Sequence, residues 1–180
     1  QLGARVVSAE PGSITLKNGD VISCGHLINA AGLYADTVAH WFGVGLDYRM
    51  LPFKGLYWYG NWPVDTLQRH IYPVPDSRNP FLGVHLTVTV NGRAKIGPTA
   101  IPSLWREDYG VVSGFNAREL GGVARTFPRF LASKEHDVLG LIRTELPKYS
   151  QKHLVKQAQR LAPRVQPKDF TEKGRPGVRA

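Results

Sequence analysis

The residues best placed to do chemistry include a histidine within an alternating segment. In residues 81–90 the even positions are aliphatic, while the odd positions are mixed, more polar, and include His85. Because side chains alternate between the two faces of a strand, the pattern predicts that His85 lies on a different face from the aliphatic residues. A neutral imidazole in a cavity wall can accept a proton as a general base. A hydrogen-bonded structural histidine is the alternative.

A second candidate is the aromatic segment 51–59, which contains Lys54, Gly55 and Tyr57. Its rings could stack on a planar ligand, and the Lys54 ammonium could bind a carboxylate. Glycine between the two polar side chains would leave room for a ligand. Strand alternation places Lys54 and Tyr57 on opposite faces, so the two are not expected to serve one pocket. The alternative is that these aromatic residues form sheet core.

A third candidate is the turn at 28–32, where a short buried strand expected over 26–32 ends in Ala30, Ala31 and Gly32 before an expected helix over 34–42. Small residues let the backbone approach a ligand closely, and a helix start favours phosphate. Tight packing at a strand–helix corner is the alternative. Neither G-x-G-x-x-G nor G-x-x-x-x-G-K-[ST] occurs in the 180 residues, so the chain has no complete nucleotide-binding fingerprint.

Charge and composition limit the possible partners. The formal net charge of +9 suggests anionic partners, and the 42% of hydrophobic residues is enough to form a core. One cysteine excludes a disulfide framework, and the six histidines show no metal-site spacing. No apolar run reaches the roughly 18 residues of a membrane span. Basic residues recur every four positions at 148, 152, 156 and 160, which predicts a solvated helix face; no nucleic-acid-binding motif accompanies them.

The elements expected to position these residues change in kind along the chain. Strands are predicted over 4–9, 13–17, 20–24, 51–59, 70–74 and 81–90, and helices over 34–42, 117–126, 128–134, 137–146 and 147–161. A two-residue hairpin loop at Asn91-Gly92 would pair Thr87 with Ile96 and His85 with Pro98. The expected fold class is α+β, a mainly antiparallel sheet with helices.

Several segments resemble one family. Residues 27–36, Leu-Ile-Asn-Ala-Ala-Gly-Leu-Tyr-Ala-Asp, resemble the second flavin-contacting segment of the D-amino-acid-oxidase-like FAD oxidoreductases. Segments 51–55, 71–75, 80–86 and 97–100 resemble one branch of that family, the L-2-hydroxyglutarate oxidases and dehydrogenases. Residues 177–180 resemble the returning Gly-x-Arg segment near the flavin. The resemblance implies part of an FAD-binding α/β domain over 1–45, a substrate-binding domain over 46–163, and a return segment over 164–180.

The resemblance also implies a reaction, the FAD-dependent oxidation of L-2-hydroxyglutarate to 2-oxoglutarate. The flavin does the redox work, and the protein supplies orientation and charge. A dicarboxylate substrate suits a basic pocket. The implied site residues are His85 as the base; Lys54, Tyr57, Tyr72 and Arg179 for the substrate; and Ala30, Ala31, Gly32 and Arg179 for FAD.

The family's N-terminal dinucleotide fingerprint is missing here, and the chain opens with Gln1. We therefore expect a central piece of a longer enzyme that neither retains FAD nor is active by itself. Oxygen and a quinone remain open as the electron acceptor. A cytoplasmic location is expected, with peripheral contact to the inner membrane as an option, and neither a metal nor a nucleic-acid partner is expected. The alternatives are an FAD-dependent oxidase of another small hydroxy or amino acid, and a basic module that binds nucleic acid or a membrane surface.

Overall fold

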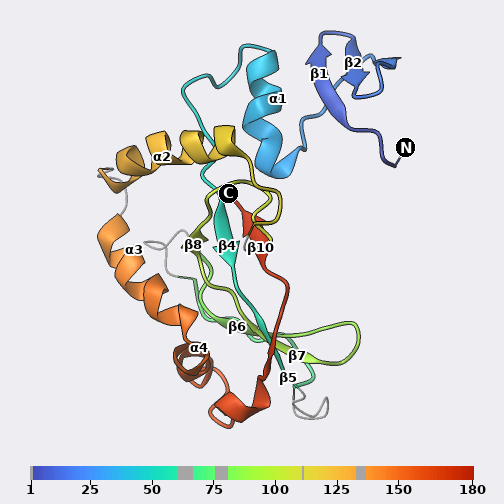
Figure 1. Cartoon of the computed structure of the whole chain (residues 1–180). Coiled ribbons are helices and arrows are strands. Elements are labelled where there is room, and N and C mark those ends of the chain that lie inside the picture. Colours follow the sequence, from blue (N-terminus) through green and yellow to red (C-terminus); the bar gives the residue numbers. More distant parts are fainter. Residues whose placement is uncertain (1, 61–66, 76–80, 111, 133–136) are drawn as a thin grey trace. The chain divides into compact units, whose positions relative to one another are not determined.

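The computed structural model describes residues 2–60, 67–75, 81–110, 112–132 and 137–180. The chain forms two compact units, unit 1 (Gln1–Leu51 with Ala180) and unit 2 (Pro52–Arg179), coloured from blue to red along the sequence in Figure 1. The division lies a few residues beyond the expected boundary at 45. Residues 164–179 belong to unit 2, because their strands pair with strands of that unit.

Unit 1 contains a small antiparallel sheet followed by a helix. Its strands are β1 (Val6–Glu10), β2 (Ser13–Leu16) and β3 (Val21–Ser23), in that order across the sheet. The turns between them contain Gly12 and Gly19, whose φ angles of 91° and 93° favour glycine. A 3₁₀ turn, η1 (Gly32–Tyr34), leads into α1 (Ala35–Trp41). The predicted hairpins and helix are therefore confirmed, whereas the buried strand expected over 26–32 is wrong, because residues 26–30 form no strand and are exposed.

Unit 2 contains two antiparallel sheets. One has the order β10 (Gly177–Arg179), β4 (Phe53–Gly55), β8 (Ile101–Pro102). The other has the order β6 (His85–Val88), β7 (Ala94–Gly97), β5 (Trp58–Gly60), β9 (Glu172–Lys173). The single strand predicted over 51–59 is thus two strands, one in each sheet. The strand predicted over 70–74 is reduced to one bridge, between Ile71 and Leu86.

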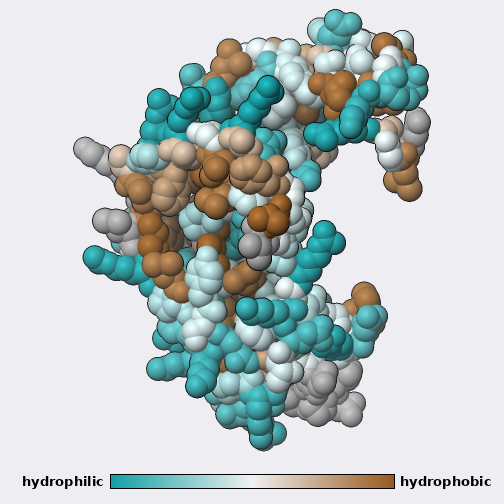
Figure 2. Space-filling view, in the orientation of Figure 1, coloured by the Kyte–Doolittle hydropathy of each residue, from teal (hydrophilic) through white to brown (hydrophobic). Residues whose placement is uncertain are grey.

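Helices complete unit 2 and confirm the α+β class. They are α2 (Ala117–Leu131), α3 (Val138–Glu145) and α4 (Gln151–Ala158), with 3₁₀ turns η2 (Leu146–Tyr149) and η3 (Pro167–Asp169). The two helices predicted over 117–134 are one helix that continues through Pro128. The Asn116 side chain accepts hydrogen bonds from the first turn of α2, which fixes its start. Figure 2 shows hydrophobic side chains gathered between α2 and α3, and hydrophilic ones over α4.

The helix predicted over 147–161 is also shorter than expected. Residues 146–149 form a 3₁₀ turn, and the α-helix begins only at Gln151. Lys148 is buried and forms an ion pair with Glu145, so it does not belong to an exposed basic face. Only the three later positions of the predicted basic series, Lys152, Lys156 and Arg160, are exposed.

The main core lies between the four-stranded sheet and α4. Leu86 and Ile96, which are directly opposite each other on β6 and β7, are fully buried against Leu154 and Val155 of α4. Each such aliphatic side chain contributes about 1.5–3 kcal/mol to folding when it is fully buried. Because residues alternate along the strands, the neighbours of Leu86 and Ile96 project from the face of the sheet opposite α4.

The β6–β7 hairpin corrects one prediction that bears on the site. The loop has three residues instead of two: the Thr89 N–H donates to the Arg93 carbonyl, and the Thr89 hydroxyl accepts from the Arg93 N–H. Gly92 adopts a φ of 73°, as three-residue hairpins require near their end. The register is therefore shifted by one residue, which places Gly97 opposite His85 and Lys95 opposite Thr87.

Membrane-spanning helices and metal-binding clusters are absent from the described residues. Within them, no helix combines the length and apolar character needed to cross a membrane. No group of three or more His, Cys, Asp or Glu side chains in this part of the chain could hold a metal ion.

Candidate active site

His85 lies on the face of the four-stranded sheet opposite α4, as the alternation predicted. Residues directly opposite each other in an antiparallel pair share a face. The pairs His85–Gly97, Thr87–Lys95 and Tyr59–Lys95 therefore place His85 and Lys95 on one face. Leu86 and Ile96 occupy the other face, in the core. The face with His85 is the polar face of the sheet.

The contacts of His85 determine which nitrogen can act as a base. Its side chain is almost completely buried, and Nδ1 lies 3.0 Å from the Gly83 carbonyl oxygen. A carbonyl can only accept, so Nδ1 carries the hydrogen and Nε2 of the neutral ring keeps its lone pair. The Tyr72 ring is tilted by 30° against the imidazole, with 4.3 Å between the ring centroids. His85 is thus a fixed imidazole with one nitrogen able to accept a proton.

The surroundings of His85 keep it neutral. Burial is the largest effect and lowers the pKa of His85 from 6.5. The bond to the Gly83 carbonyl raises this pKa, while the nearby charges of Lys95, Arg179 and His70 lower it. The net direction is downward, so the uncharged form of His85 predominates at neutral pH.

Tyr57 lies in the chain between β4 and β5, and its ring packs beside Gly97 of β7, the residue that pairs with His85. A Cβ atom on Gly97 would come within 2.6 Å of Tyr57 Cδ1, so the ring can occupy this position only because residue 97 is glycine. The Lys95 Nζ atom lies 4.2 Å from the centroid of the same ring. Burial raises the pKa of Tyr57 and Arg179 lowers it, with a net upward direction. The Tyr57 hydroxyl therefore stays protonated at neutral pH and can donate a hydrogen bond.

Arg179 projects from β10, where it pairs with Phe53 of β4. Its guanidinium carbon lies 5.4 Å from the centroid of the Phe81 ring. Its Nη2 atom is buried and has no hydrogen-bond partner among the described residues. A buried donor without a partner costs about 1–3 kcal/mol, a cost that a carboxylate ligand would remove. Arg179 is also near enough to affect the pKa of both His85 and Tyr57.

Lys54 is engaged elsewhere. Its Nζ atom lies 2.5 Å from Asp108 Oδ1, and Asp108 also accepts a hydrogen bond from the Ser103 hydroxyl. Lys54 pairs with Val178, the neighbour of Arg179, so Lys54 and Arg179 project from opposite faces of the three-stranded sheet. The structure thus groups His85, Tyr72, Tyr57 and Arg179, whereas the Lys54 charge is already compensated by a carboxylate of the chain.

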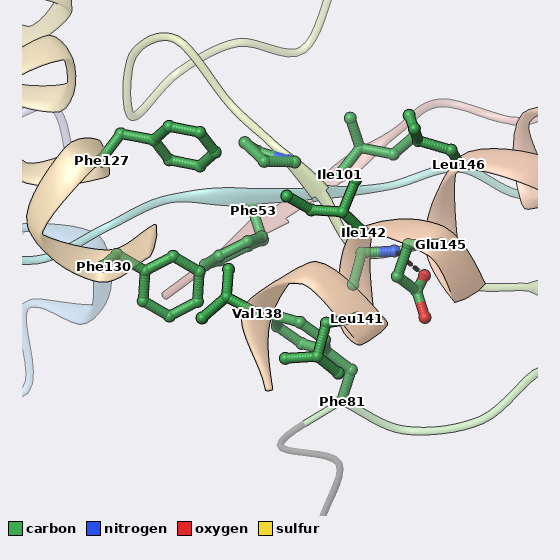
Figure 3. Close-up of a pocket in the computed structure, with 12 residues that line it drawn as sticks. Phe53, Phe81, Ile101, Phe127, Phe130, Val138, Leu141, Ile142, Glu145 and Leu146 are labelled. Atoms are coloured by element: carbon green, nitrogen blue, oxygen red, sulfur yellow. Dashed lines mark hydrogen bonds between the residues drawn. The ribbon is translucent and has the colours of Figure 1, made fainter. Parts of the chain in front are cut away.

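An apolar cavity lies between the three-stranded sheet and the helices α2 and α3 (Figure 3). Its volume is about 40 Å³, and Phe53 and Phe81 form part of its lining with 4.7 Å between their centroids. The Glu145 carboxylate at its edge accepts the Ala100 N–H and pairs with Lys148. Because the only charged group in its lining is already satisfied, this cavity does not suit a dicarboxylate. The Phe81 ring, over which Arg179 lies, is part of the wall of this cavity.

The expected cofactor segment belongs to unit 1. The Asn29 side chain accepts from the Ala31 N–H and donates to the Ala35 carbonyl, which fixes the turn. Ala30 and Gly32 are exposed, and the space where a Cβ of Gly32 would lie is open. Gly32 has a φ of 54°, which favours glycine. A small, ordered and accessible backbone of this kind fits close contact with a flat cofactor such as FAD.

Sequence reasoning missed Lys95. The residue is placed on the His85 face by its pairing with Thr87, whereas the predicted two-residue loop put Ile96 opposite Thr87. The signal was available, because Ala94 and Ile96 continue an apolar alternation whose other face contains Lys95.

The chain belongs to the DAO family, "FAD dependent oxidoreductase", whose family model matches residues 1–180. It is 36% identical to an L-2-hydroxyglutarate dehydrogenase of Indibacter alkaliphilus over 188 residues, covering 99% of this chain and 45% of that protein. It is 34% identical to the mitochondrial enzyme of that name from Caenorhabditis briggsae, covering 97% of the chain and 38% of the relative. The human mitochondrial enzyme is 41% identical over 99 residues, which is 53% of this chain and 21% of that protein.

The chain thus spans less than half the length of these curated relatives. A solved glycine oxidase from Geobacillus kaustophilus aligns with 97% of the chain and 35% of its own chain, at 18% identity and a TM-score of 0.49. The resemblance drawn from the sequence motifs is confirmed by the family and by these relatives. A cytoplasmic location remains a prediction, since two of the relatives are named as mitochondrial.

Proposed function

We propose that this chain supplies the base and the carboxylate-binding residues of an FAD-dependent enzyme that oxidises L-2-hydroxyglutarate to 2-oxoglutarate. The observation that carries the proposal is the neutral, buried His85 with the two cations Lys95 and Arg179 near it. The names of the relatives support the choice of substrate. Oxidation of a 2-hydroxy acid needs a proton acceptor for the hydroxyl group and positive charge for the carboxylates, and this group of residues offers both.

Each residue has a role that its position supports. Nε2 of His85 accepts the hydroxyl proton, and Arg179 binds the adjacent carboxylate through its fork of N–H donors. The Tyr57 and Tyr72 hydroxyl groups donate hydrogen bonds to substrate oxygens. Bound FAD supplies the acceptor for the hydride that leaves C2 of the substrate.

FAD itself would be held by the accessible backbone of Ala30, Ala31 and Gly32. A second contact of Arg179 with FAD stays a prediction. An oxidase passes the electrons to oxygen, whereas a dehydrogenase of this kind passes them to an acceptor such as a quinone. Peripheral contact with a membrane would favour the quinone.

The proposed reaction is tested on the full-length, flavin-loaded protein under anaerobic conditions. L-2-Hydroxyglutarate should bleach the flavin absorbance and give one 2-oxoglutarate per flavin by mass spectrometry. Lactate and glycine, which lack the second carboxylate, should bleach it at least about tenfold more slowly, since a missing charged contact is worth about 1.4 kcal/mol or more. D-2-Hydroxyglutarate should also be slower, because with its carboxylates and hydroxyl group in the same contacts its C2 hydrogen points away from the flavin. Faster bleaching by lactate or glycine would assign the enzyme to another small hydroxy or amino acid. Mixing the reduced protein with oxygen or a quinone analogue then identifies the acceptor.

We expect the 180-residue chain by itself neither to retain FAD nor to turn over substrate. The pyrophosphate of a dinucleotide is normally bound by a Gly-rich turn at a helix start, and these residues contain no G-x-G-x-x-G. Gel filtration after incubation with FAD should give a protein peak without flavin absorbance at 450 nm or so, the usual flavin band. Circular dichroism of the same peak serves as the control for folding. Flavin that co-elutes with the folded chain would contradict this expectation.

A further inference from the structure

We propose that Lys95 binds the second carboxylate of the substrate and thereby makes the enzyme select a dicarboxylate. The inference rests on the proposed function and deepens it, because Arg179 alone would serve any 2-hydroxy acid. It also replaces Lys54 in this role, since Lys54 is paired with Asp108.

Lys95 lies on the same face of the four-stranded sheet as His85. Lys95 lies opposite Thr87 on β7, and Gly97 lies opposite His85, so Lys95 is the diagonal neighbour of His85 on the same face. Diagonal neighbours of an antiparallel pair are about 7–8 Å apart, within reach of a long side chain. Gly97 has no side chain, and the space that its Cβ would take is filled by the Leu56 carbonyl and the Tyr57 ring, so this ring lies next to the strand position opposite His85.

Three other cations of unit 2 have acidic partners: Lys54 pairs with Asp108, Lys148 with Glu145, and Arg93 with Glu172 at 2.6 Å. Lys95 forms no ion pair with any described residue, and its ammonium rests on the face of Tyr57. A half-buried cation that has only an aromatic ring beside it gains from an anionic ligand.

Two cations, Arg179 and Lys95, lie near His85, and both lower its pKa. Both are also close to Tyr57: Arg179 lowers the pKa of its hydroxyl group, and Lys95 Nζ lies 4.2 Å from the centroid of its ring. Two uncompensated cations beside one base repel each other, and a monocarboxylate would neutralise only one of them. A substrate with two carboxylates would neutralise both, with its hydroxyl carbon at His85.

The decisive variant is Lys95→Met in the full-length, flavin-loaded protein, because methionine keeps the length of the side chain and removes the charge. We expect kcat/KM for L-2-hydroxyglutarate to fall about 10- to 100-fold, mainly through KM, as for a lost charged hydrogen bond. L-2-Hydroxypentanoate has the same number of carbon atoms but a methyl group in place of the second carboxylate. Its kcat/KM should change less than about threefold. Lys95→Arg should recover most of the loss, because it restores the cation.

Lys173→Met is the matched control. Lys173 also lies over an aromatic ring, 5.6 Å from the centroid of Trp58, but it pairs with Trp58 and so projects from the opposite face of the sheet. Lys173→Met should leave kcat/KM for both substrates unchanged. If Lys95→Met lowers the efficiency for both substrates in parallel, Lys95 supports Tyr57 and does not select the dicarboxylate.

A binding measurement separates this inference from the proposed reaction. Glutarate and butyrate, which cannot be oxidised at C2 in this way, are titrated against the flavin absorbance of the wild type and of Lys95→Gln. Glutarate should bind about tenfold more weakly to the variant, while butyrate should bind equally to both. Equal glutarate affinities would overturn the role of Lys95 even if L-2-hydroxyglutarate is oxidised. Weakened glutarate binding in a protein that does not oxidise L-2-hydroxyglutarate would instead reject the proposed reaction and leave Lys95 as a dicarboxylate ligand.

Discussion

Replacing Arg179 by alanine should lower kcat/KM for L-2-hydroxyglutarate in the full-length protein by about 30-fold to several thousand-fold. The reason is the buried Nη2 donor that has no partner in the described part of the chain and is available to a carboxylate. Loss of one partner of a buried charged hydrogen bond costs about 2–5 kcal/mol, which corresponds to that range. Arg179→Lys should recover little, since one ammonium cannot reproduce two parallel hydrogen bonds. Steady-state kinetics on both variants gives the comparison.

The control for Arg179 is Arg175→Ala. Arg175 comes from the same C-terminal segment and also lies over an aromatic ring, 5.2 Å from the centroid of Tyr109, but it is exposed. Its variant should keep the parental kcat/KM. In Arg179→Ala, kcat/KM for lactate should fall by the same factor as kcat/KM for L-2-hydroxyglutarate, because both substrates contain the carboxylate next to the hydroxyl group. Parental efficiency of Arg179→Ala on both acids would place the carboxylate site elsewhere.

His85→Ala should lower kcat about 100-fold or more, the usual effect of losing a general base. Because His85 is also bonded to the Gly83 carbonyl and packed on Tyr72, a second variant is needed to separate catalysis from structure. His85→Asn can still donate to that carbonyl but cannot accept a proton, so it should be as inactive as His85→Ala while it keeps the parental melting temperature. His153→Ala, on α4 behind the sheet, is the control. Activity of His85→Asn within threefold of the parent would make His85 a structural residue.

The pH profile of the parent gives an independent measurement of the same residue. The protonated imidazole cannot accept a proton, so kcat/KM should fall as the pH drops through the pKa of His85 in the free enzyme. Burial and the charges of Lys95, Arg179 and His70 hold this pKa below 6.5, so the acid limb should lie below that pH. Tyr57, whose pKa is raised by burial, stays neutral and adds no charge there. An acid limb above pH 6.5 would contradict the assignment of the base.

The sequence by itself determined the features that depend on local periodicity and turn chemistry. The alternation over 81–90 placed His85 on the face opposite Leu86 because strand geometry fixes the side-chain period at two. The glycine turns at 12 and 19 fixed the first hairpins because few residues tolerate a positive φ. The short motifs were sufficient to identify the family, which the match over residues 1–180 confirms.

Only the tertiary structure decided which charges are available. Lys54 finds its partner Asp108 far along the chain, and no local pattern predicts such a pair. Arg179 reaches the site because β10 pairs with β4, and Tyr57 reaches it because residue 97, the last residue of β7, is glycine. The predicted hairpin loop was one residue too short, and each one-residue shift in register exchanges the faces of a strand. The sequence therefore did not place Lys95 on the face of His85. Periodicity is a local property of the chain, whereas the compensation of a charge depends on contacts between residues distant in sequence.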